Sequence, residues 1–166
     1  MIRKSVPADY QTLLHLYAVA REAMKQSGNP TQWGDDRPYP SRIEADIRDG
    51  LGYVVERGGR ICGAFTLLTT PEPTYAVIDG AWQSDDPYVT LHRVASDGTE
   101  RGVLTEILAF ADSVCPCIRI DTHENNRIMQ HILTKAGFVC CGVITLADGS
   151  PRLAYQRCQN TEGSLV

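Results

Sequence analysis

The segment from Tyr88 to Phe138 contains the residues with the clearest potential for chemistry. A strand-like run, Val89 to Val94, is followed by a glycine-bearing turn over residues 97–102 and then by an amphipathic helix. The first N–H groups of a helix have no partner within the helix, and together with the helix dipole they attract anions. The turn and the start of this helix therefore predict a binding site for a diphosphate group.

A second strand and helix follow this pair. Residues 118–121 alternate in a strand-like pattern, and the next helix is opened by Asn126 and closed by Gly137. Asparagine is a favoured N-cap, and a glycine just past the last turn is typical of a left-handed C-cap. The central part of the chain is therefore predicted to run strand, helix, strand, helix.

The N-terminal region is predicted to contain a strand and two helices. Residues 2–6 form a short alternating segment, and apolar residues recur at helical spacing over 10–24. Ser41 is the predicted N-cap of a short helix ending at Asp49, because Glu44 three residues later completes a capping box.

Glycines and prolines divide the remaining residues into strands. Gly58 and Gly59 separate two apolar runs, which predicts a hairpin, and the second run is apolar enough to lie deep in a sheet. Residues 75–82 are interpreted as another strand, and 139–146 with 153–158 as a C-terminal hairpin. These elements indicate one α/β domain over residues 1–158, followed by a polar tail over 159–166.

Composition limits the classes of function. With 166 residues, 43% hydrophobic and 22% charged, the chain is typical of a soluble globular domain, and no apolar run reaches the roughly 20 residues that span a bilayer. A net charge of −4 argues against nucleic acid as a partner. The cysteine spacings do not match zinc knuckles, so no metal is expected, and Cys115, Cys117, Cys140 and Cys141 are interpreted as reduced, buried thiols. The cytoplasm is the expected location.

The order of these elements resembles the GNAT-type acetyltransferases, which bind acetyl coenzyme A (acetyl-CoA). This resemblance implies a mixed, mostly antiparallel sheet flanked by helices, with acetyl-CoA as co-substrate. The family usually carries Gln/Arg-x-x-Gly-x-Gly/Ala in the turn; here Thr99, Gly102 and Leu104 stand at its three defining positions. The resemblance places the cofactor contacts on the strand, the turn and the starts of both helices: Val94, Ala95, Glu100, Arg101, Gly102, Val103, Leu104, Thr105, Asn126 and Met129.

The same resemblance suggests the proton-transfer residues. The family's base is usually a carboxylate or histidine near the strand that holds the acetyl carbonyl, and His92 lies on the same face of that strand as Val94. Asp79, on what is expected to be the neighbouring strand, is the second candidate base. Many relatives use a tyrosine as general acid where this chain has Leu133, so Tyr155 is considered for that role. Alternatively, His92 and Arg93 belong to a buried polar network.

The resemblance implies transfer of acetyl from acetyl-CoA to a primary amine on a small molecule or peptide. Two alternatives remain: a non-catalytic domain that senses coenzyme A or its acyl esters, which Leu104 and Leu133 favour, and a protein interaction module. A homodimer is the default assembly, with no membrane partner. Four aromatic residues are expected to wall the acceptor side, with anchoring of their loops to the core as the alternative for each: Trp33, Tyr39, Trp82 and Tyr88.

Overall fold

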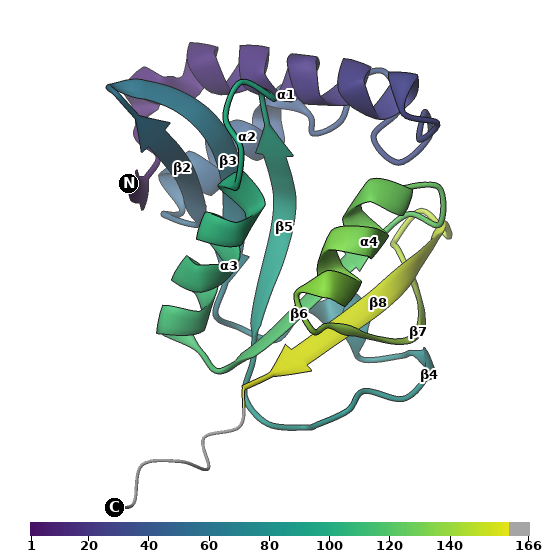
Figure 1. The fold of residues 1–166 in the computed structure, drawn as a ribbon. Helices are drawn as coiled ribbons and strands as arrows, with labels where there is room; N and C mark the ends of the chain where they lie inside the picture. The colour runs from purple at the N-terminus through teal and green to yellow at the C-terminus, as the bar shows by residue number, and fades with distance from the viewer. Residues whose placement is uncertain (160–166) are drawn as a thin grey trace, which may run out of the picture.

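Eight strands form a single sheet in the computed structural model, which describes residues 1–159 (Figure 1). Residues 160–166 of the expected polar tail lie outside the described residues. The strands are β1 (Ile2–Lys4), β2 (Gly52–Arg57), β3 (Arg60–Leu68), β4 (Asp79–Gly80), β5 (Val89–Ser96), β6 (Cys117–Thr122), β7 (Val139–Thr145) and β8 (Pro151–Cys158). The α-helices are α1 (Tyr10–Gln26), α2 (Pro40–Arg48), α3 (Val103–Val114) and α4 (Arg127–Lys135), and the short 3-10 helices are η1 (Pro7–Asp9) and η2 (Pro73–Tyr75).

The sheet is mixed but mostly antiparallel, as predicted. Its strand order is β1-β2-β3-β5-β6-β8-β7-β4, and within the described residues only β5 and β6 pair in parallel. A parallel pair needs a crossover, and α3 provides it. The predicted position of the 60–68 strand deep in the sheet is confirmed, because β3 lies between β2 and β5.

Helices cover both faces of the sheet. Alternate residues of a strand face opposite sides, so Val55 belongs to the cluster under α3 and α4 while its neighbour Val54 packs with α1 and α2. Figure 1 shows α3 and α4 in front of the sheet and α2 behind it. Val103 and Ile107 lie one turn apart on α3, and both are buried. Their spacing gives α3 one apolar face, which packs against the same cluster as Val55.

The two central strands part at the middle of the sheet. The β5–β6 ladder ends at the pair Leu91–Ile120, although β5 continues to Ser96. The pairing of β5 with β3 is interrupted by a bulge opposite Phe65, where Arg93 has a φ of 51°. A bulge bends its strand, and here it turns the second half of β5 away from β6.

Two predictions about local structure are wrong. Helix α2 begins at Pro40 after Tyr39, without a side-chain cap, because the fixed φ of proline suits the first helical position better than the expected Ser41 N-cap. Residues 75–82 are not a strand: the chain forms η2 and then only the two-residue β4, which pairs with β7 at the far edge of the sheet.

The interpretation of the cysteines also needs correction. Cys117 is not a free thiol but forms a disulfide with Cys158. The two residues face each other in the antiparallel register of β6 and β8, which places their Cβ atoms close together. Cys140 is reduced but exposed, and Cys115 and Cys141 are only partly buried.

Gly63 allows the start of α3 to approach the sheet. A Cβ built at this position would lie 2.5 Å from Cγ1 of Val103. Overpacking of this kind costs about 1 to 3 kcal/mol. We therefore expect Gly63→Ala to lower the free energy of unfolding by that amount in urea titrations. Adding Val103→Ala should recover part of the loss, and an unchanged midpoint in the single variant would contradict the close contact.

Candidate active site

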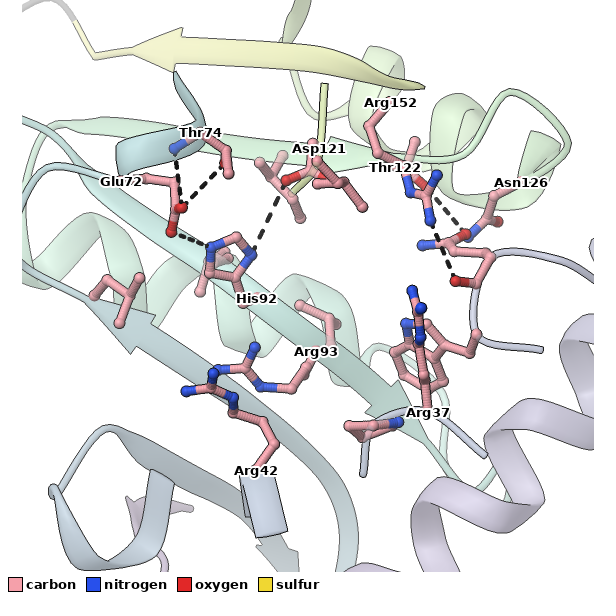
Figure 2. A pocket seen from close by; sticks show the side chains of 18 of the residues that line it. Arg37, Arg42, Glu72, Thr74, His92, Arg93, Asp121, Thr122, Asn126 and Arg152 are labelled. Atoms are coloured by element: carbon pink, nitrogen blue, oxygen red, sulfur yellow. Dashed lines mark hydrogen bonds and ion pairs between the residues drawn. The ribbon is translucent and has the colours of Figure 1, made fainter. Parts of the chain in front are cut away.

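A pocket of about 590 Å³ lies where β5 and β6 part. Residues 91–94 of β5 and 120–122 of β6 form its floor, the start of α4 contributes Asn126 and Met129, and the 32–39 loop closes one side. Figure 2 shows the titratable side chains of these elements directed into the same space. The pocket is therefore a consequence of the bulge and the short parallel ladder.

His92 and Glu72 form a hydrogen-bonded pair on one wall of this pocket. Nε2 of His92 lies 2.8 Å from Oε2 of Glu72, and both residues line the pocket. Glu72 precedes η2 and also accepts hydrogen bonds from Thr74, at 3.3 Å from its N–H and 3.0 Å from its hydroxyl. The hydrogen bond with His92 is the main reason that the pKa of Glu72 is lowered to about 2.

This pairing determines which nitrogen of His92 is basic. Glu72 is ionised at neutral pH, and an ionised carboxylate only accepts hydrogen bonds, so Nε2 carries a hydrogen and donates it. In the neutral ring the lone pair then lies on Nδ1. The nearest carboxylate to Nδ1 is that of Asp121, with Oδ2 at 4.0 Å, which is too long for a direct hydrogen bond. His92 can therefore accept a proton at Nδ1.

Buried tyrosines position the acidic groups around His92. The hydroxyl of Tyr75 donates to Oδ2 of Asp121 at 2.7 Å, and the pKa of this buried tyrosine is raised well above its ordinary value, mainly by desolvation. The hydroxyl of Tyr88 accepts a hydrogen bond from the N–H of Glu72 at 3.1 Å. Tyr75 therefore holds the carboxylate of Asp121, and Tyr88 holds the backbone of Glu72.

Arg93 fixes the bulge next to His92. Its Nε and Nη2 donate to the two carboxylate oxygens of Asp46 on α2, at 2.7 and 3.0 Å. The hydroxyl of Thr66 donates to Asp46 at 2.8 Å, and that of Tyr17 donates to the carbonyl of Arg93 at 3.0 Å. The expected network between Arg93 and His92 is not formed: Arg93 pairs with Asp46, and His92 pairs with Glu72.

The start of α3 has the features of an anion site. Its first helical hydrogen bond runs from the N–H of Glu106 to the carbonyl of Gly102. Within residues 1–159, the N–H groups of Val103, Leu104 and Thr105 have no acceptor in good hydrogen-bonding geometry. Gly102 has a φ of 74° and open space where a Cβ would stand. The side chain of Leu104 packs against the core cluster that contains Val55.

The remaining predicted cofactor residues have different surroundings. Val94 lines the pocket, whereas Ala95 is buried in the cluster under α1. Oε2 of Glu100 lies 3.4 Å from Nη1 of Arg57, and its Oε1 lies 3.6 Å from Nη2 of Arg60. The carbonyl of Arg101 accepts a hydrogen bond from Arg57 at 2.9 Å.

Asn126 has the capping role that its sequence position also allows. Its Oδ1 accepts from the N–H of Met129 at 3.1 Å, and its Nδ2 donates to Gln32 at 3.0 Å. Both Asn126 and Met129 line the pocket. The cap therefore also fixes one pocket wall to the 32–39 loop.

Two of the predicted proton-transfer residues lie away from the pocket. Asp79 is exposed on β4, and β6, β8 and β7 separate that strand from β5, so its predicted place beside His92 is wrong. Tyr155 pairs with Ile120 across β8 and β6 and is buried in the main core. Its pKa is raised, mainly by desolvation, and it does not line the pocket. Neither residue can exchange a proton with a ligand bound between β5 and β6.

The four aromatic residues divide into two pairs. Trp33 and Tyr39 line the pocket as predicted. The prediction is wrong for Trp82 and Tyr88, whose rings enclose the guanidinium of Arg119, each with its centroid 4.0 Å away. This pair anchors the 82–88 loop to β6.

Sequence reasoning missed several residues of the site, among them Glu72, Asp121, Arg152 and Arg37. Asp121 is the last residue of a predicted strand, where a loop begins, and loops often carry functional residues. This position could have identified it as a candidate. Glu72 lies in a loop between two prolines, and Arg152 follows a proline at the start of a strand, so neither position suggests a pocket.

Similarity to known proteins was found at the level of structure. No protein-family model and no curated protein sequence matches the chain. A GNAT-family acetyltransferase from Streptococcus agalactiae is 32% identical, with a TM-score of 0.86 over 97% of this chain and 96% of that one. Two further crystal structures share the fold.

One is a GNAT-family acetyltransferase from Listeria monocytogenes, with 24% identity and a TM-score of 0.71 over 96% of this chain and 94% of that one. The other is a ribosomal-protein-alanine N-acetyltransferase from Brucella melitensis, with 19% identity and a TM-score of 0.60 over 96% of this chain and 99% of that one. The identity and coverage of the Streptococcus match, together with the parted central strands, show that this chain belongs to the GNAT family of acetyltransferases.

Proposed function

We propose that the protein transfers acetyl from acetyl-CoA to a primary amine, with His92 as the general base. The observation that carries this proposal is the His92–Glu72 pair, which faces the pocket between the parted strands and leaves Nδ1 able to accept a proton. A sensor domain needs no such pair, so this observation favours the enzyme over the non-catalytic alternative.

The residues present fit acetyl-CoA. The amides at the start of α3 suit its diphosphate, because they are unpaired and Gly102 leaves open space beside them. Val94, Asn126 and Met129 would contact the pantetheine arm along the pocket wall. Beyond Leu91 the edge of β5 that faces β6 has no ladder partner among residues 1–159, so its backbone groups would be available to the arm and the acetyl carbonyl. When bound, acetyl-CoA supplies an acetyl group activated as a thioester.

The protein's part in the reaction is to remove a proton and hold the resulting charge. An amine attacks as the free base, and the new amide forms with loss of a proton, which Nδ1 of His92 accepts directly or through water. Ionised Glu72 then stabilises the imidazolium through Nε2. The thiolate leaves without help from Leu133, which has no acidic proton, or from Tyr155, which is buried in the core and does not line the pocket.

Two measurements test this function. Acetyl-CoA at 100 times its Kd should raise the free energy of unfolding by about 2.7 kcal/mol, and thus Tm by roughly 5 to 10 °C. Thiol release should then be observed with at least one amine class among amino acids, polyamines, aminoglycosides and peptides. Binding without turnover would instead indicate the sensor, and the absence of a Tm shift would indicate an interaction module.

The cellular setting remains a prediction. No helix within residues 1–159 is long and apolar enough to cross a bilayer. The cytoplasmic location and the homodimer both stay predictions; size-exclusion chromatography with light scattering tests the second.

A further inference from the structure

Arg152 is a buried cation without an acidic partner. It is 6% exposed and lies just beyond the C-terminal end of β6, since its neighbour Leu153 pairs with Thr122. Its guanidinium donates to the carbonyls of Pro151 and Gln32, at 2.8 and 3.3 Å. No carboxylate of residues 1–159 lies within 4.0 Å of it. A guanidinium has five N–H donors, so most of its hydrogen-bonding capacity remains unused.

This arrangement is electrostatically unfavourable. Burial without a counter-charge disfavours the charged form, and desolvation lowers the pKa of Arg152. Asp121 and Asp148 raise that pKa from a distance, but neither touches the guanidinium. An anionic group at this point of the pocket would supply the missing partner.

The space beside Arg152 is large enough for such a group. A second cavity of about 320 Å³ adjoins the main pocket, and five residues line both: Trp33, Arg37, Tyr39, Asp148 and Arg152. Asp148 is paired with Arg37, whose Nη1 donates to it at 3.1 Å, and the Arg37 guanidinium also lies over the ring of Tyr39. Figure 2 shows Arg152 and Arg37 at one end of the pocket and His92 with Glu72 at the other.

The two ends of the pocket differ in charge. Around His92 the carboxylates are those of Glu72 and Asp121, which suit an amine. The cations on this side of the pocket are Arg93, which pairs with Asp46, and Arg42. Around Arg152 the free donors are cationic, which suits an oxyanion. A guanidinium matches a carboxylate best because its fork can donate two parallel hydrogen bonds.

We propose that the acceptor is a small amino carboxylate, whose carboxylate binds Arg152 with help from Arg37 while its amine faces His92. This inference rests on the proposed acetyl transfer and narrows it to one substrate class, of which free amino acids are the simplest members. Polyamines and aminoglycosides lack the anionic group and should be poor substrates.

The test compares matched acceptors. Thiol release from acetyl-CoA is measured with the common amino acids, with the amide of each, and with aminoalkyl phosphates. The amide is the weaker base and presents more free amine, so a preference for the acid cannot come from amine basicity. Charge-assisted hydrogen bonds of this kind predict that the best acid exceeds its amide in kcat/KM by about 10- to 100-fold.

Variants assign the preference to Arg152. Arg152→Gln should reduce the ratio of acid to amide to about one, mainly through the KM of the acid, and Arg152→Lys should retain part of it. Arg48→Gln, at an exposed arginine outside the pocket, should leave the ratio unchanged. A merely structural role for Arg152 would lower Tm and the rates with both acceptors together, without changing the ratio.

The possible failures are distinguishable. If amides, polyamines or aminoalkyl phosphates are acetylated as well as the acids, the acetyltransferase proposal stands and the inference about the acceptor is wrong. If Arg42→Gln removes the preference and Arg152→Gln does not, the assignment to Arg152 is wrong. If no amine of any class is acetylated although acetyl-CoA binds, the proposed function itself fails.

Discussion

His92→Ala should lower kcat by a factor of about 10² to 10⁴, the usual contribution of a positioned general base. The loss should be seen in kcat at saturating amine, because His92 acts on the proton that leaves during attack. Glu72→Gln should also reduce kcat, since a neutral amide stabilises the imidazolium less and can donate to Nε2, which would move the hydrogen to Nδ1. Steady-state thiol-release kinetics measure both effects.

The pH dependence identifies the group responsible. A general base acts only in its unprotonated form, so the rate should fall on the acidic side of the profile. Glu72, with its pKa lowered to about 2, stays ionised over the whole accessible range and cannot produce that limb. His92→Ala should therefore remove the acidic limb, while Asp79→Ala, on the distant β4, should leave the profile unchanged. An acidic limb that persists in His92→Ala would show that another group is the base.

Asp46→Ala should destabilise the fold by about 3 to 5 kcal/mol, the typical cost of removing one partner from a buried ion pair. Asp46 and Arg93 are largely buried, with side chains 9% and 20% exposed, so the substitution would leave the Arg93 guanidinium without a counter-charge at the bulge. Tm should fall by roughly 10 °C or more, and urea unfolding should give the free energy directly.

A nearby exposed ion pair provides the control. Asp49 pairs with Arg48 at the end of α2, and both side chains are well exposed at 48% and 72%. Asp49→Ala should change stability by less than about 0.5 kcal/mol. Equal stability of Asp46→Ala and Asp49→Ala would show that the Arg93 pair does not hold the bulge.

The fold was largely predictable because its signals are local. The helical spacing over 10–24 and the paired glycines at 58 and 59 lie within single elements, and the structure confirms α1 and the β2–β3 hairpin. The prediction of a strand over 75–82 was wrong because tertiary contacts outweigh the local composition there. The hydroxyl of Tyr75, for example, donates to Asp121 from a short 3-10 helix.

The site was only partly predictable because it is built across long sequence distances. His92 could be found from its place on one face of a strand, but its partner Glu72 is 20 residues earlier in an irregular loop. Asp79 was misplaced because strand order cannot be read from the chain, and β4 pairs with β7 instead of β5. The Cys117–Cys158 pairing was hidden for the same reason, since it depends on the register of β6 and β8.

The short ladder between β5 and β6 has a mechanical consequence. Within residues 1–159, the N-terminal half of the sheet, ending at β5, pairs with the C-terminal half, starting at β6, along a seam of three residue pairs. These pairs are Val89–Ile118, Thr90–Arg119 and Leu91–Ile120. Helix α3 packs across this seam, against β5 on one side and β6 on the other, so the side chains beneath it set the tilt between the two halves and the width of the cleft mouth. Substitutions of side chains beneath the seam should therefore change the size of the substrate that the cleft accepts. They would do so without altering any group that touches the substrate.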